Sequence, residues 1–155
     1  MSKNLSRDSR FRGLKIAITG ANGSLGRSLI KEFKNKGAYV LGLTQSKKNY
    51  KSSIKTDPDK WISWSCGDEK KISSELAEID ILILNHGFNP KGIIDSNEIT
   101  KSLEINSLSH WRLIQIFENL NMEILNRKET NSKHKEIWIN TSEAEIQIAF
   151  SPIYE

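Results

Sequence analysis

The sequence predicts an α/β fold in which helices cover both faces of one doubly wound parallel sheet. Short apolar stretches alternate with longer segments of helical periodicity, which is typical of parallel strands joined by crossover helices. The first stretch leads into three glycines at three-residue spacing, and a helical pattern begins at once. A length of 155 residues suits one domain. Together these observations predict the strand order 3-2-1-4-5.

The composition narrows the class of protein. A hydrophobic fraction of 37% and a charged fraction of 27% suit a soluble globular protein. The single cysteine, Cys66, excludes a disulfide framework and predicts a reducing, cytoplasmic location. No apolar run is long enough for a transmembrane segment, and the N-terminus lacks a secretory signal. No metal site is expected.

The net charge of +4 lies in the first fifteen residues, where five basic side chains face Asp8 alone. Residues 1–12 are predicted to be a basic flexible arm, and residues 13–155 to be the folded domain. Such an arm could touch nucleic acid or an acidic membrane, or it could be a solvated extension, which we favour. No nucleic-acid site is predicted, because the aromatic residues do not interleave with a basic stripe.

The first predicted strand covers residues 14–19, and the helix after the glycines covers residues 24–36. One face of this helix is apolar, and Gly37 stands where a C-terminal cap is expected. The residues predicted to share that face are Leu25, Leu29, Ile30 and Phe33.

The glycine turn between this strand and helix predicts a dinucleotide diphosphate site. Gly20 lets the chain turn sharply, Gly23 lets the main chain approach phosphate oxygens, and Gly26 lets the helix pack close to the strand. A plain tight connection is the alternative. The predicted cofactor-binding residues of the turn are Gly20, Ala21, Asn22, Gly23, Ser24, Leu25 and Gly26.

The second predicted strand covers residues 38–44, and no carboxylate follows it. Thr44, Gln45, Ser46 and Lys47 stand where an NAD site would place an acid against the adenosine ribose. Hydroxyls and lysines would instead hold a 2′-phosphate, so NADP is favoured over NAD as cofactor. The lysines could also simply begin a solvated loop.

The third and fourth strands are predicted over residues 61–65 and 79–84, with a short helix between them over residues 68–78. Ile72 and Leu76 should point inward from that helix. The fourth strand ends in Asn85, His86 and Gly87, which places a polar turn at the sheet edge where ligands bind in open α/β sheets.

The longest helix is predicted over residues 96–125, with any interruption near Asn106, and the fifth strand follows over residues 136–141. Asn106 and His110 occupy an otherwise apolar stripe. A locally bonded core or interface histidine is the preferred interpretation of His110, whereas a functional role is favoured for Asn106. The apolar members of the stripe are Ile99, Leu103, Leu113, Phe117, Leu120 and Ile124.

These motifs resemble the short-chain dehydrogenase/reductase family over nearly all of residues 13–155. The glycine turn from Thr19 to Gly26 is similar to the family's cofactor turn in its extended branch, and Asn85-His86-Gly87 is similar to its Asn-Ala-Gly turn. A weaker likeness points to the reductase-like half of sterol desaturase/short-chain dehydrogenase fusions. The resemblance implies a Rossmann fold that binds a nicotinamide dinucleotide.

The resemblance also implies catalytic roles. Tyr154 would exchange a proton with the substrate oxygen, Ser142 would orient that oxygen, and Asn106 would hold a relay water. Thr141 is a secondary candidate, because the serine–tyrosine spacing is one residue short of the commoner pattern. The family's lysine would fall at position 158, so we expect a C-terminally truncated chain with little or no turnover. Cys66-Gly67 stands where the family often has an aspartate that touches adenine.

The expected function is therefore that of an NADP-dependent oxidoreductase acting on a small-molecule carbonyl or alcohol, and a homo-oligomer is possible through the long helix. Two alternatives stay open. One is a non-catalytic NAD(P)-binding module, which needs neither Ser142 nor Tyr154. The other is a doubly wound domain that binds a flavin or a mononucleotide.

Overall fold

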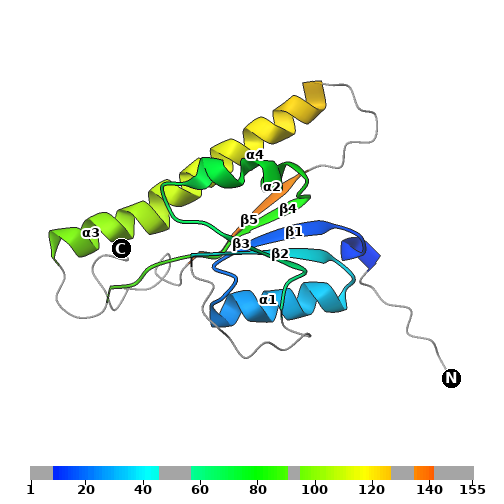
Figure 1. Ribbon diagram of the computed structural model, residues 1–155, viewed down its shortest axis with the longest axis horizontal. Helices are drawn as coiled ribbons and strands as arrows, with labels where there is room; N and C mark the ends of the chain where they lie inside the picture. Colours follow the sequence, from blue (N-terminus) through cyan, green and yellow to red (C-terminus); the bar gives the residue numbers. More distant parts are fainter. Residues whose placement is uncertain (1–8, 46–56, 91–94, 127–134, 142–155) are drawn as a thin grey trace.

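The structure is a computed structural model that describes residues 9–45, 57–90, 95–126 and 135–141. Its centre is a five-stranded parallel sheet with the order β3-β2-β1-β4-β5, which confirms the predicted topology (Figure 1). The strands are β1 (Lys15–Thr19), β2 (Tyr39–Thr44), β3 (Lys60–Ser63), β4 (Ile81–Leu84) and β5 (Glu136–Ile139).

The helices also fall where the sequence predicts them, with two refinements. The segment before β4 divides into a 3₁₀ turn and a short α-helix, and the interruption near Asn106 is a π-helical turn. The helical elements are η1 (Ser9–Phe11), α1 (Ser24–Asn35), η2 (Glu69–Ile72), α2 (Ser73–Ala77), α3 (Ser96–Leu103), η3 (Glu104–Leu108) and α4 (Ser109–Asn126).

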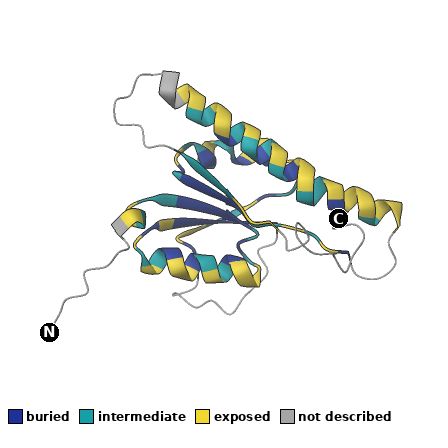
Figure 2. Cartoon of the chain, turned by 180° about the vertical axis from the view of Figure 1, so that it is seen from behind, coloured by how far each residue is buried: buried dark blue, intermediate teal, exposed yellow. Residues whose placement is uncertain are grey.

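Alternation along the central strand β1 divides the core into two layers. Ile16 and Ile18 point to the face covered by α1, where Ile30 and Phe33 are buried. Ala17 points to the opposite face, which η2, α2 and α4 cover. Figures 1 and 2 show these helix layers on either side of the buried strands. Both faces of the sheet are covered, and this explains why its central strands are almost entirely apolar.

The topology sets where a ligand would bind. The chain leaves β1 toward β2 on one side of the sheet and reaches β4 on the other, so the strand order reverses beside β1. The carboxyl ends of parallel strands meet at one edge, and the crevice at such a switch point is the usual ligand site in open α/β sheets. The turns that begin at Gly20 and Asn85 both lie at this edge.

Three residues predicted on apolar faces are exposed, which corrects the expectation that those faces are buried throughout. The exposed fractions of Leu25, Ile99 and Leu103 are 46%, 43% and 55%. α3 extends beyond the carboxyl end of the sheet, so its apolar side chains have no strand beneath them (Figure 1). Leu25 lies in the first turn of α1, at the same edge.

The packed part of the chain begins before residue 13. In η1, Phe11 makes edge-to-face contacts with Phe33 of α1 and Trp138 of β5, with ring centroids 5.2 and 6.0 Å apart. Nη2 of Arg10 donates to both carboxylate oxygens of Glu136 at 2.9 Å. The last residues of the segment expected to be a flexible arm therefore tie the start of the chain to the sheet edge.

The described residues contain no helix with the length and apolar character that crossing a bilayer would require.

Candidate functional site

A cavity of about 560 Å³ opens at the carboxyl edge of the sheet. Its walls come from the start of α1, from the ends of β2 and β4, from the loop after β3, and from α3 and η3. Most of the predicted cofactor-binding residues that the structure describes meet here. The lining residues are Gly20, Gly23, Ser24, Leu25, Thr44, Gln45, Trp64, Cys66, Asn85, His86, Gly87, Phe88, Lys101, Ile105 and Asn140.

The three glycines of the turn serve different purposes. Gly20 has a φ of +60°, and a Cβ on it would lie 2.7 Å from the carbonyl oxygen of Asn85, so the turn needs glycine for both conformation and space. A Cβ on Gly26 would overlap the carbonyl oxygen of Gly20 and lie 2.7 Å from the Cα of Ala21. A Cβ on Gly23 would meet nothing closer than the carbonyl oxygen of Gly20 at 3.4 Å, and Gly23 lines the cavity.

The start of α1 presents main chain to the cavity. Gly23 is the N-cap residue and offers no side-chain acceptor to the first-turn N–H groups, and the first turn contains no acidic residue. Ser24 and Leu25 line the cavity directly, which accounts for the exposure of Leu25. Uncapped N–H groups and the positive end of the helix dipole favour an anion at this place.

Three predicted residues of the turn, Ala21, Asn22 and Gly26, do not line the cavity. Ala21 is fully buried, and its N–H donates to the carbonyl of Leu43 at 3.3 Å. Arg27 holds Asn22 by donating to the side-chain oxygen at 2.8 Å and to the carbonyl oxygen at 3.3 Å. These contacts hold the turn in shape without forming part of the cavity wall.

Thr19, at the end of β1, connects the glycine turn to the turn after β4. Its buried hydroxyl accepts hydrogen bonds from the N–H groups of Asn85 at 2.8 Å and His86 at 3.2 Å. The same hydroxyl donates to the carbonyl of Ile83 at 3.3 Å, and Nδ1 of His86 lies 2.8 Å from its oxygen. Nε2 of His86 lies 3.1 Å from the hydroxyl of Ser109, so the imidazole ring bridges two hydroxyl groups.

His86 is a neutral wall residue of the cavity. Burial, with the neighbouring His110 ring adding to it, lowers the pKa of His86 to about 3. The two rings meet edge to face with centroids 4.1 Å apart, and Nε2 of His110 donates to the carbonyl of His86 at 2.9 Å. Burial also lowers the pKa of His110. The expectation that His110 is bonded locally is thus confirmed, and neither imidazole is a proton carrier at neutral pH.

Asn106 holds the segment that follows the β4 turn. From the π-helical turn η3 its side-chain oxygen accepts the N–H of Phe88 at 2.7 Å, and its side-chain nitrogen donates to the carbonyl of Phe88 at 2.8 Å. A third bond reaches the hydroxyl of Ser102 at 3.1 Å. Asn106 therefore sits at the strand ends, one residue away from the cavity wall formed by Ile105 and Phe88.

Three cavity residues, Trp64, Lys101 and Asn140, were not singled out from the sequence, whereas Cys66 was noted as standing where the family often has an aspartate that touches adenine. Trp64 and Cys66 follow β3, and burial raises the pKa of the Cys66 thiol. Asn140 follows β5 and donates from its side-chain nitrogen to the side-chain oxygen of Asn85 at 3.1 Å. Trp64 and Asn140 share a signal that could have located them, since each comes directly after a strand of the parallel sheet. Lys101 carries no such signal.

Four candidate residues lie outside the described ranges, so the structure gives no placement for them: Ser46, Lys47, Ser142 and Tyr154.

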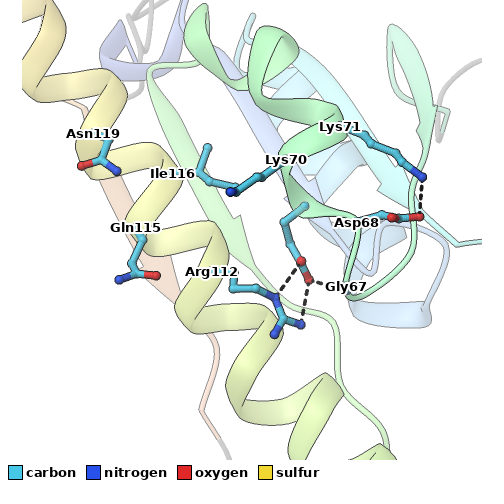
Figure 3. A pocket seen from close by; sticks show the side chains of 9 residues that line it. Gly67, Asp68, Lys70, Lys71, Arg112, Gln115, Ile116 and Asn119 are labelled. Carbon is cyan, nitrogen blue, oxygen red and sulfur yellow. Dashed lines mark hydrogen bonds and ion pairs between the residues drawn. The ribbon is translucent and has the colours of Figure 1, made fainter.

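A second, smaller cavity of about 370 Å³ lies between η2 and α4 (Figure 3). Glu69 is buried beside it, with 1% of its side chain exposed, and Nε of Arg112 donates to its carboxylate at 2.8 Å. Burial opposes ionisation of Glu69, but bonds from Arg112 and from the N–H of Gly67 outweigh it and lower the carboxyl pKa. Arg112 also pairs with Glu104, so it connects η2, η3 and α4.

The geometry of the larger cavity fits a dinucleotide. Bare main chain at a helix start suits a diphosphate, and the polar edge residues Thr44, Asn85 and Asn140 suit ribose hydroxyls. Trp64, Leu25 and Ile105 supply apolar surface for aromatic rings.

A family model, a curated relative and several solved structures match this chain. The model of the NAD dependent epimerase/dehydratase family matches residues 16–128. A curated relative, the monoglucosyldiacylglycerol epimerase of Synechocystis sp., is 39% identical over 150 residues; the match covers 94% of this chain and 35% of the relative. The chain thus spans about a third of the length of that relative.

Solved structures share the fold at low sequence identity. A short-chain dehydrogenase from Leptospira borgpetersenii with bound NAD⁺ has a TM-score of 0.76 at 21% identity, over 99% of this chain and 63% of that one. A protein from Escherichia coli CFT073, described as a short-chain dehydrogenase and complexed with NADPH, has a TM-score of 0.75 at 16% identity. That likeness covers 96% of this chain and 67% of the other.

Proposed function

This chain belongs to the NAD dependent epimerase/dehydratase family, and from that premise we propose that it binds a nicotinamide dinucleotide at the carboxyl edge of its sheet for hydride transfer with a secondary alcohol or its carbonyl. The observation that carries the proposal is the bare main chain at the start of α1. Gly23 leaves one side of the backbone open to the cavity, and no carboxylate lines that cavity among the described residues. A diphosphate at this place would meet N–H donors and no repulsion.

The residues around the cavity would orient the dinucleotide rather than react with it. Thr19 and His86 hold the glycine turn and the β4 turn in a fixed relation, and Asn106 fixes the main chain of Phe88. When bound, a nicotinamide ring supplies or takes up the hydride. Preorganised walls of this kind raise the rate by holding reacting groups in one geometry.

Proton transfer is assigned to residues outside the described ranges, by the family resemblance. The hydroxyl of Tyr154 would give its proton to the substrate oxygen as a carbonyl is reduced, and would take it back as an alcohol is oxidised. Ser142 would donate a hydrogen bond to the same oxygen. The neutral histidines His86 and His110 do not compete for this role, because burial keeps their pKa values low.

We favour NADP as the cofactor. Thr44 and Gln45 line the cavity at the end of β2, where a carboxylate would repel a 2′-phosphate, and the sequence continues with Ser46 and Lys47. A hydroxyl and an ammonium group would both donate to phosphate oxygens.

A second candidate function is epimerisation at a sugar carbon, favoured by the 39% identity to the monoglucosyldiacylglycerol epimerase. A secondary alcohol would lose its C–H hydride to the dinucleotide and its hydroxyl proton to Tyr154, giving a ketone. Return of the hydride to the opposite face, together with return of the proton from Tyr154 to the oxygen, would restore the alcohol with its carbon inverted and would regenerate the cofactor. A glucolipid with a diacylglycerol tail is the substrate class this relative suggests.

Binding can be tested with the natural fluorescence of the four tryptophans, one of which, Trp64, lies in the cavity wall. We expect NADPH to quench the tryptophan emission and to raise the melting temperature, and NADH to bind more weakly. Gly23→Ala should fold normally, since its new methyl group contacts nothing closer than 3.4 Å, yet bind NADPH at least tenfold more weakly because the methyl enters the cavity. Wild-type affinity in Gly23→Ala would contradict the proposed site.

Turnover separates the candidate functions. Oxidation of NADPH in step with loss of a carbonyl substrate supports the reductase. Inversion of a glucolipid headgroup at constant NADPH absorbance supports the epimerase. Binding without either reaction, in a chain extended to the full length of its relatives, would favour the non-catalytic module.

A further inference from the structure

Few charged side chains among the described residues line the cavity that we assign to the dinucleotide. Of the residues that line it in the described part of the chain, Lys101 has the single formally charged side chain. His86, the other titratable base in the wall, is neutral at physiological pH. A dinucleotide carries two negative charges on its diphosphate, and within the described part of the chain the positive charge that faces this cavity comes from Lys101 and from the start of α1.

We propose that Lys101, which lines the same cavity as the glycine turn, binds the phosphate oxygens of the dinucleotide as a second anion contact besides the main chain at Gly23 and Ser24. This inference rests on the proposed function, because it takes the ligand of the cavity to be a nicotinamide dinucleotide. It adds a charged contact from α3, an element that the glycine turn does not include.

The position of Lys101 is suited to that role. Its Nζ lies 4.0 Å from the ring centroid of Phe88, which is a cation–π distance, and it makes no ion pair with any carboxylate of the described segments. The ring attracts the ammonium group without consuming its N–H donors. A lysine held in this way keeps its donors available for phosphate oxygens, whereas a lysine in an ion pair would first have to leave its carboxylate.

Phe88, whose ring lies under the ammonium group of Lys101, is held in place through its main chain. Asn106 binds both the N–H and the carbonyl of Phe88, and neither bond involves the aromatic ring. The ring can therefore be removed without releasing the backbone, so the contribution of the ring can be measured apart from that of the Asn106 contacts.

The experiment compares Lys101→Met with Lys70→Met by titration calorimetry. Both lysines are exposed, and Lys70 lines the second cavity, so the pair removes the same charge inside and outside the proposed site. The probes are NADP⁺, NAD⁺, ADP-ribose and adenosine. We expect Lys101→Met to weaken NADP⁺, NAD⁺ and ADP-ribose about tenfold, with a shallower salt dependence, and to leave adenosine unchanged.

Three other measurements test whether the effect comes from the charge of Lys101 and from the ring that holds it. Lys101→Arg should restore most of the affinity, because the charge is kept, and Lys70→Met should match the wild type. Phe88→Leu should lose roughly threefold in ADP-ribose affinity, since the ammonium is no longer held over a ring. Unaltered melting temperatures without ligand would show that the variants are folded.

Two results would overturn the inference, and they differ. If the wild type binds ADP-ribose and Lys101→Met binds it equally well, Lys101 does not contact the diphosphate, and the proposed function stands. If the wild type binds none of the three phosphate-containing probes, the proposed function fails and the role of Lys101 fails with it.

Discussion

At the scale of single residues, the space around Gly26 and Gly23 differs although both belong to one turn. A methyl group on Gly26 would press on the carbonyl of Gly20 and on the Cα of Ala21, both of which are main-chain atoms that cannot rotate away. We expect Gly26→Ala to lower the free energy of unfolding by about 1–3 kcal/mol.

Urea unfolding measures this cost, and Gly23→Ala is the matched control. Gly23 has a φ of −70° and no neighbour within 3.4 Å of the added atom, so its replacement causes no overlap and should cost only the preference for glycine over alanine at an N-cap, about 0.5–1 kcal/mol. Equal stability of the two variants would show that α1 does not pack against the turn as described.

The buried imidazole of His86 predicts a pH dependence of stability. Its pKa is about 3 in the folded chain and ordinarily about 6.5, so between these values the unfolded chain binds more protons. This contribution is complete above pH 6.5 and is lost as the pH falls toward 3. We expect the free energy of unfolding to drop by roughly 2 kcal/mol between pH 7 and pH 5.

His110 shifts in the same direction and adds to the loss. Denaturant titrations at several pH values measure the slope, and His86→Gln separates the two histidines, since an amide does not titrate. The slope between pH 7 and pH 5 should be smaller in that variant. A flat profile in the wild type would mean that His86 is accessible to protons.

At the scale of elements, the π-helical turn η3 depends on the contacts of Asn106. Asn106→Leu leaves the N–H and the carbonyl of Phe88 without their side-chain partner, and we expect it to destabilise the chain by about 1–3 kcal/mol. Asn106→Asp keeps the acceptor for the N–H but places a carboxylate oxygen against the carbonyl of Phe88, where the amide nitrogen now donates at 2.8 Å, so it should be destabilised as well. Thermal and urea unfolding of the three proteins measure both costs, and wild-type stability in either variant would contradict the described bonding.

Arg112 joins η2 to α4 by neutralising a carboxylate that is almost fully buried. Arg112→Met should cost about 3 kcal/mol, because Glu69 is left as an unpaired charge that only the N–H of Gly67 and neighbouring hydroxyls can stabilise. Adding Glu69→Gln should recover most of that loss, because the buried charge is gone.

The loss of unfolding free energy in Arg112→Met should also depend on pH, which tests whether Glu69 is left as an unpaired charge. Without its cation, the pKa of Glu69 should rise above its unfolded value, and such a group loses stability as the pH rises through the folded pKa. The difference in unfolding free energy between variant and wild type should therefore be larger at pH 8 than at pH 5. The opposite trend would show that Glu69 has another counter-charge.

At the scale of the whole molecule, η1 connects the start of the chain to the last strand. Phe11, Phe33 and Trp138 form an aromatic cluster, and Phe11→Ala should lower the free energy of unfolding by about 2 kcal/mol. Arg10→Ala removes an exposed ion pair with Glu136 and exposed cation–π contacts with the rings of Phe11 and Trp138, and it should cost about 1 kcal/mol, less than the loss of the Phe11 ring. Urea unfolding compares the two, and equal costs would show that the aromatic contacts do not stabilise the domain.

The family resemblance inferred from the glycine turn, Asn85 and Asn106 is confirmed by the family model and the shared fold. The parallel order of the strands, the cap at Gly37 and the interruption near Asn106 were also predicted correctly. The assigned roles of Ser142 and Tyr154 and the preference for NADP stay predictions.

The sequence by itself determined the elements and their order, because strand and helix periodicity, glycine turns and caps depend on residues that are neighbours along the chain. Only the tertiary structure decided which polar groups meet. The bond between Thr19 and His86 joins residues 67 positions apart, and the placement of Lys101 over Phe88 depends on how α3 extends past the sheet. The exposure of Leu25, Ile99 and Leu103 has the same origin, because burial depends on what lies opposite a helix face and not on the face alone.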